Sequence, residues 1–97
     1  MNYVLSQEAE LDLVDIYDYS LEEWGTAQAD IYLRGLYDAF ATSSRFPAKG
    51  RLRLDLGFDV RSVLYKSHII FYVEAVAGIA IVRVMHHARD IDEEFSR

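Results

Sequence analysis

The spacing of apolar residues changes once along this chain, and no other feature constrains the fold as strongly. Before residue 46, apolar side chains such as Ala9, Leu13 and Ile16 recur every three or four positions, which is typical of amphipathic helices. After Gly50 they alternate with charged residues, as in strands. The change falls at residues 46–50, which hold the only proline. A helical first part and a strand-rich second part predict an α+β fold.

Two helices are predicted before the break. Ser6 suits the N-cap of the first, whose apolar side continues to Tyr17 and Trp24, and Gly25 stands where a glycine closes a helix. We expect Trp24 to anchor the core or the hairpin. Thr26 is the candidate N-cap of the second helix, which should end near residues 43–44. The short connection predicts a helical hairpin.

Strands are predicted on both sides of the hairpin. Residues 2–5 read as an edge strand, and the alternation over 51–56 places Leu52, Leu54 and Leu56 on one face. Three β-branched and aromatic runs follow at 60–66, 69–76 and 79–86, with separators short enough for antiparallel hairpins. The predicted order is β-α-α-β-β-β, a helical hairpin packed on an antiparallel sheet. Residues 1–97 are expected to form a single domain.

Composition narrows the class of protein. The chain has no cysteine, so it needs neither disulfides nor thiolate metal ligands. Its first residues lack the basic and apolar regions of a secretory signal. No apolar run reaches the roughly 20 residues that a membrane span requires. We expect a soluble, cytoplasmic protein with no membrane contact.

Charge is distributed unevenly. Residues 1–44 hold nine acidic side chains and one basic side chain, Arg34, for a net charge of −8. Residues 45–89 hold eight basic and three acidic side chains, for a net charge of +5, although the whole chain carries −6. This asymmetry predicts either two chemically different faces or solvated helices in front of an ordinary sheet.

Basic and imidazole side chains form the main candidate site. Guanidinium groups on a sheet face could bind phosphates or carboxylates. The alternative is that these arginines pair with Asp55, Asp59, Glu74 and Asp90. The set comprises Arg51, Arg53, Arg61, Lys66, His68, Arg83, His86, His87 and Arg89.

No residue stands out as catalytic. His86 and His87 should point to opposite sides of a strand, which disfavours a shared metal site, although a histidine there could serve as a general acid or base. Acidic residues such as Asp15 and Asp18 read as a solvated helix surface. The chain lacks a glycine-rich phosphate loop, a Gly-x-Ser-x-Gly elbow and a His-Glu-x-x-His motif. We therefore expect no metal or other cofactor.

A series of segments resembles the ParE branch of the RelE/ParE toxin superfamily. The series covers nearly the whole chain in order, and its members are individually weak but specific together. They are Ala9-Glu10-Leu11-Asp12-Leu13-Val14-Asp15-Ile16 with Tyr19 and Trp24-Gly25; Gln28-Ala29 with Tyr32 and Leu36; Phe46-Pro47 with Gly50; Val60-Arg61 and Ser67-His68-Ile69-Ile70-Phe71-Tyr72; and Ile81-Val82-Arg83-Val84-Met85-His86 with Arg89-Asp90.

The resemblance implies the predicted fold and a role in a toxin–antitoxin pair. It implies a ParD-like antitoxin encoded beside the toxin, and DNA gyrase as the target. The RelE branch instead contains ribosome-dependent messenger RNA nucleases that use basic strand residues and a His or Tyr near the end of the last strand. A third alternative is a non-toxic binding module of the same fold.

Charge favours the gyrase alternative. Phosphate contacts dominate affinity for nucleic acids, so a protein of net charge −6 is poorly suited to bind ribosomal RNA. We expect the protein to act by binding rather than by catalysis, without sequence-specific binding to nucleic acid. The predicted partner-binding residues are Arg51, Arg53, Arg61, Arg83, His86 and Arg89.

Overall fold

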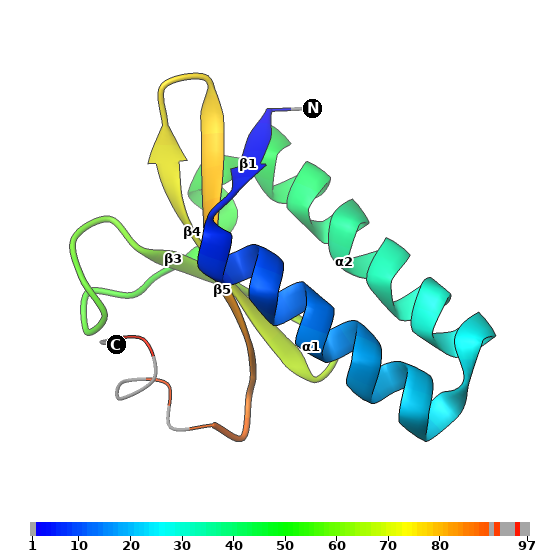
Figure 1. The fold of residues 1–97 in the computed structure, drawn as a ribbon. Helices are drawn as coiled ribbons and strands as arrows, with labels where there is room; N and C mark the ends of the chain where they lie inside the picture. Colours follow the sequence, from blue (N-terminus) through cyan, green and yellow to red (C-terminus); the bar gives the residue numbers. More distant parts are fainter. Residues whose placement is uncertain (1, 90, 92–94, 96–97) are drawn as a thin grey trace.

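The fold has two layers, a helical hairpin and a five-stranded sheet (Figure 1). It is seen in a computed structural model that describes residues 2–89, 91 and 95; Asp90, one of the expected acidic partners, lies outside them. The α+β class and the helical hairpin packed on a sheet are confirmed, and four strands follow the hairpin, one more than the order β-α-α-β-β-β contains. The elements are β1 (Tyr3–Leu5), α1 (Gln7–Trp24), α2 (Thr26–Arg45), the 3₁₀ turn η1 (Pro47–Lys49), β2 (Arg51–Leu52), β3 (Arg61–Tyr65), β4 (His68–Ala75) and β5 (Gly78–His86).

The sheet is mixed, which corrects the expectation of a wholly antiparallel one. The order of its strands is β1-β5-β4-β3-β2. The pairs β2–β3, β3–β4 and β4–β5 are antiparallel. The first strand, β1, instead pairs parallel with β5, with Tyr3 opposite Ile79 and Leu5 opposite Ile81. A short turn reveals the direction of neighbouring strands, but both helices and three strands separate β1 from β5, so no local signal encodes their direction.

The helix ends follow the sequence closely, with one correction. Ser6 caps α1, since its hydroxyl oxygen accepts a hydrogen bond from the Ala9 N–H at 3.0 Å. Gly25, at φ +85°, is the only residue between the helices. Its carbonyl accepts from the Ala29 N–H at 3.1 Å, so Gly25 occupies the position predicted for Thr26 at the start of α2.

The main core lies between the helices and one face of the sheet. Two of its largest side chains, Phe40 from α2 and Tyr72 from β4, are fully buried. Trp24 does not join this core: it is 59% exposed and makes an edge contact with Tyr19, which corrects its predicted role. The core comprises Ala9, Leu13, Ile16, Leu36, Phe40, Ile70, Tyr72, Ile79, Ile81 and Val84.

A smaller apolar cluster covers the other face of the sheet. It is built on Val60, Phe71 and Met85, and the loop after β2 contributes Leu56. The strand predicted over 51–56 ends at Leu52, because residues 53–60 leave the sheet and cross this cluster. As a result Leu54 is 71% exposed while Leu56 is half-buried, so the leucines do not share a face as predicted.

We expect Tyr72→Phe to destabilise the fold. The Tyr72 hydroxyl donates to the Pro47 carbonyl at 2.8 Å and accepts from the Gly50 N–H at 3.1 Å. Removing it leaves both backbone groups without this partner, which costs about 1–3 kcal/mol. Urea unfolding measures the loss, and Tyr19→Phe is the matched control because Tyr19 is 60% exposed. Equal unfolding midpoints for the two variants would contradict the assigned role.

Candidate functional site

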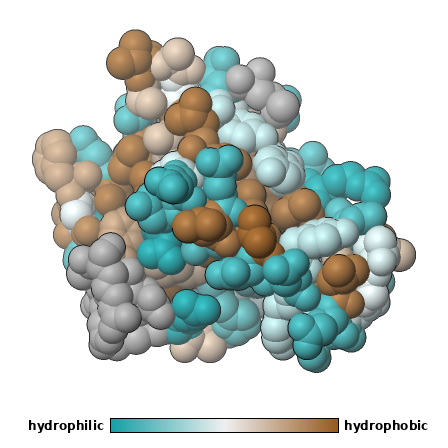
Figure 2. All heavy atoms as spheres, viewed as in Figure 1, coloured by the Kyte–Doolittle hydropathy of each residue, from teal (hydrophilic) through white to brown (hydrophobic). Residues whose placement is uncertain are grey.

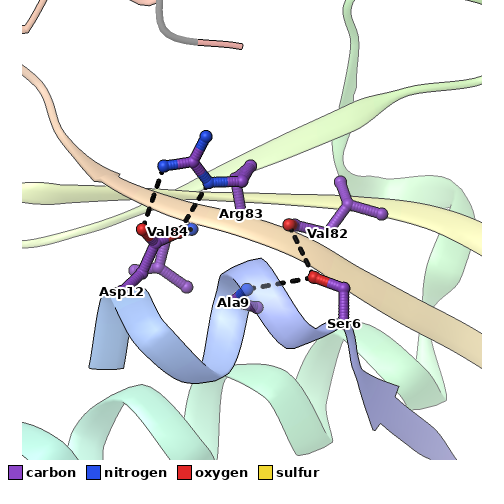
Figure 3. Close-up of polar contacts among 6 residues, drawn as sticks. All are labelled: Ser6, Ala9, Asp12, Val82, Arg83 and Val84. Carbon is purple, nitrogen blue, oxygen red and sulfur yellow. Dashed lines mark hydrogen bonds and ion pairs between the residues drawn. The ribbon is translucent and has the colours of Figure 1, made fainter. Parts of the chain in front are cut away.

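The site begins where β5 loses its neighbouring strand. The short β1 covers β5 only as far as Ile81. Beyond that point the side chains of α1 take over, as Figure 3 shows. The Ser6 hydroxyl donates to the Val82 carbonyl at 2.8 Å, and the Val84 N–H donates to Asp12 Oδ2 at 2.8 Å. Two polar side chains of one helix therefore replace part of a missing strand.

Asp12 also binds Arg83. Arg83 Nε lies 2.8 Å from Asp12 Oδ2 and its Nη2 lies 3.0 Å from Oδ1, a bidentate ion pair (Figure 3). The side chains are only 19% and 14% exposed. Asp12 was not among the acidic partners expected for the arginines. A signal in the sequence could have identified it. Asp12 is next to Leu13 and four residues before Ile16, so it lies at the border of the apolar side of the helix.

A groove of about 480 Å³ lies between α1 and the end of β5. Three predicted partner-binding residues, Arg83, His86 and Arg89, line it. From α1 come carboxylates and the Tyr19 ring. The lining residues are Asp12, Asp15, Ile16, Tyr19, His68, Arg83, Val84, Met85, His86, Ala88 and Arg89. The groove therefore carries both signs of charge, which favours a partner with mixed polarity over a polyanion.

His68 is the most strongly perturbed group in the groove. Burial, together with electrostatic repulsion from His86, His87 and Arg89, lowers the pKa of His68 from 6.5 to about 4, and Asp12 opposes this shift. The ring is therefore neutral at pH 7. The Tyr32 hydroxyl, whose pKa is raised by burial, forms a hydrogen bond of 2.7 Å with His68 Nδ1.

His86 and His87 correct a prediction. Their rings stack 4.7 Å apart, centroid to centroid, although adjacent strand residues should face opposite sides. The reason is that β5 ends at His86, so the alternation does not extend to His87. His86 Nδ1 accepts from the Ala88 N–H at 3.0 Å, and the His86 ring lies 5.4 Å from that of His68. Among the described residues, no group of three or more His, Cys, Asp or Glu side chains could hold a metal ion.

The other three predicted residues lie at the opposite edge of the sheet. Arg61 Nη1 donates to the Gly50 carbonyl at 2.9 Å and to the Ala48 carbonyl at 3.3 Å. Arg53 pairs with Asp55 at 2.9 Å, as the ion-pair alternative expected, and lies over the Phe71 ring. Arg51 is exposed on β2. The predicted site is therefore two surfaces, because β5 and β2 are separated by two strands.

Comparisons with known proteins agree with this fold. A family model described as "ParE toxin of type II toxin-antitoxin system, parDE" matches residues 3–91. "Toxin ParE1" of Mycobacterium tuberculosis is 35% identical over 91 residues, covering 93% of each chain. "Toxin ParE1" of Caulobacter vibrioides is 35% identical over 86 residues, covering 89% of this chain and 88% of that one.

A solved structure described as "Chromosomal ParDE TA system from P. aeruginosa" has the same fold. Its TM-score is 0.76 at 18% identity, and the match covers 89% of this chain and 95% of that one. Within the described residues, neither helix is long and apolar enough to cross a membrane.

The fold, the length and these matches define a small α+β toxin of the toxin–antitoxin class. More narrowly, the chain belongs to the ParE toxin family of type II toxin–antitoxin systems, as its sequence resemblance predicted. Membership in a two-component system implies an antitoxin partner.

We expect Asp12→Ala to unfold more readily than the unsubstituted protein. It removes the acceptor of the Val84 N–H and leaves the half-buried Arg83 without this carboxylate. The expected cost is about 2–4 kcal/mol, measured by urea unfolding. Asp15→Ala is the matched control, because Asp15 lines the same groove but is exposed, so its loss should stay within about 0.5 kcal/mol. Similar losses for both variants would exclude the proposed role of Asp12.

Stability should fall as the pH is lowered from about 6.5 toward 4. The unfolded chain protonates His68 near pH 6.5, whereas the folded protein does so only near pH 4. Between these values the unfolded state binds more protons, so its free energy drops relative to the folded state. Thermal unfolding between pH 7 and pH 5 measures the effect. His68→Gln, which can still form a hydrogen bond with Tyr32, should flatten this slope, and an unchanged slope would refute the assignment.

Proposed function

We propose that this protein is a cytoplasmic toxin that inhibits DNA gyrase and is held inactive by a ParD-like antitoxin. The observation that carries the proposal is the match to the ParE family across residues 3–91, with relatives 35% identical over about nine-tenths of the chain. The resemblance to ParE toxins implies gyrase as the target.

Charge supports a protein target. Residues 1–44 have a net charge of −8, and α1, whose exposed Asp15 lines the groove next to the Asp12–Arg83 ion pair, forms one wall of the groove. Like charges repel within a Debye length of about 8–10 Å, so this wall disfavours close approach of RNA. A protein surface with basic or mixed charge meets no such penalty.

The arginines of the two surfaces are held mainly by the protein itself. Arg83 binds Asp12, Arg53 binds Asp55, and Arg61 donates to backbone carbonyls. Charges that are already compensated contribute less to phosphate binding. They can still present planar, oriented donors to a partner, so Arg51, Arg53, Arg61, Arg83, His86 and Arg89 are the proposed contact residues of the antitoxin and the target.

The purified protein should inhibit ATP-dependent supercoiling by gyrase and trap cleaved DNA. Adding the antitoxin encoded beside it should restore supercoiling, because the proposal places both proteins in one regulatory pair. His86→Ala should weaken the inhibition of gyrase only by the loss of one contact and should not abolish it, since no proton transfer is required of the imidazole.

Two results would overturn the proposal. Normal supercoiling at saturating toxin, with stalled translation extracts and cut messenger RNA, would identify a RelE-like nuclease. In that case His86→Ala should abolish cleavage, because His86 lies at the end of the last strand, beside the neutral His68. If neither supercoiling nor translation is affected, the chain is a non-toxic binding module.

A further inference from the structure

The loop between β2 and β3 displays apolar side chains that the fold does not use. Leu54 is 71% exposed and Phe58 is 88% exposed, while Leu52, on β2, is 42% exposed. Leu56 and Val60 of the same loop pack against the sheet. Figure 2 shows hydrophobic side chains gathered on the surface over this loop, at the left of the view. We call Leu54, Phe58 and the exposed Arg51 the loop patch, without Leu52, because adjacent strand residues such as Arg51 and Leu52 point to opposite faces of the sheet.

The backbone holds Phe58 outward. Gly57 has φ +145° and Asp59 has φ +64°, a left-handed conformation that a residue other than glycine adopts only rarely. The Arg53 N–H donates to the Val60 carbonyl at 2.7 Å, which closes the base of the loop. Backbone conformations of this cost persist where the surrounding structure fixes them, and they concentrate at functional sites. A loop fixed in this way loses little conformational entropy when a partner binds.

Charge indicates the chemistry of the partner. Residues 45–61 carry five basic side chains and two acidic ones, and one of these acids, Asp55, is bound by Arg53. This is a basic stretch in a chain of net charge −6. An acidic segment is attracted here and repelled by the helices, whose residues 1–44 carry −8.

We propose that the loop patch docks an acidic segment of the antitoxin, with Phe58 and Leu54 inserted among its apolar side chains. Scattered exposed apolar residues need no explanation, but Leu54 and Phe58 are four positions apart in one short loop that follows the exposed Arg51 in the sequence. An apolar centre with a charged rim is the usual anatomy of a protein interface, and arginine is enriched in its energetic centres. The inference rests on the proposed antitoxin partnership, not on gyrase.

Calorimetric titration of the full chain with the antitoxin encoded beside it tests the proposal. Phe58→Ser should weaken binding at least tenfold without lowering the melting temperature, because the side chain is almost fully exposed. Leu64→Ser is the matched control: Leu64 is 70% exposed on β3, and its loss should change the Kd less than twofold.

A charge reversal tests the rim. Arg51→Glu should weaken binding at least threefold and reduce the dependence of the Kd on salt, because it replaces attraction by repulsion. Arg34→Glu is the control, since Arg34 is exposed on α2 within the acidic part. It should change the Kd less than twofold.

The possible outcomes separate the two proposals. If the unsubstituted chain does not bind the antitoxin, the partnership fails and this inference fails with it. If the chain binds and Phe58→Ser binds equally well, only the inference fails. If Phe58→Ser binds the antitoxin normally but no longer inhibits gyrase, the occupant of the loop patch is the target instead, and the assignment to the antitoxin is wrong.

Discussion

Asp12 is the side chain on which the joining of helix and sheet depends. One of its carboxylate oxygens accepts from the Val84 backbone and the Arg83 guanidinium, and the other also accepts from Arg83. A strand whose neighbour ends early would otherwise leave polar backbone groups exposed or unsatisfied beside the core. The same carboxylate orients Arg83 along the groove, so the interaction that closes the sheet edge also shapes the candidate site.

The sequence predicted the elements well because their signals are local. Ser6 as the N-cap of α1, Gly25 as its end, and the three-stranded meander all follow from patterns within a few residues. The parallel pairing of β1 with β5 could not be predicted in this way, since no turn joins the two strands. The prediction for Trp24 was wrong because the helical period shows which side of the helix is apolar, but not how far along the helix the sheet covers that side. Trp24, at the end of α1, is 59% exposed.

The site was predicted less well because tertiary contacts divide it. Six residues were expected on one sheet, yet Arg83, His86 and Arg89 line the groove while Arg51, Arg53 and Arg61 surround the far edge. Strand order, which sequence spacing does not encode, decides this separation. The protein therefore has two candidate surfaces of different character.

Gly25 limits how chains of this design can vary in length. As the single residue between two long helices, at φ +85°, it fixes where α2 starts relative to α1. Each residue inserted near the start of α2 would turn the following side chains by about 100°, because a helix has 3.6 residues per turn. Leu36 and Phe40, both fully buried, would then point away from the sheet. Insertions and deletions should therefore be excluded from the hairpin.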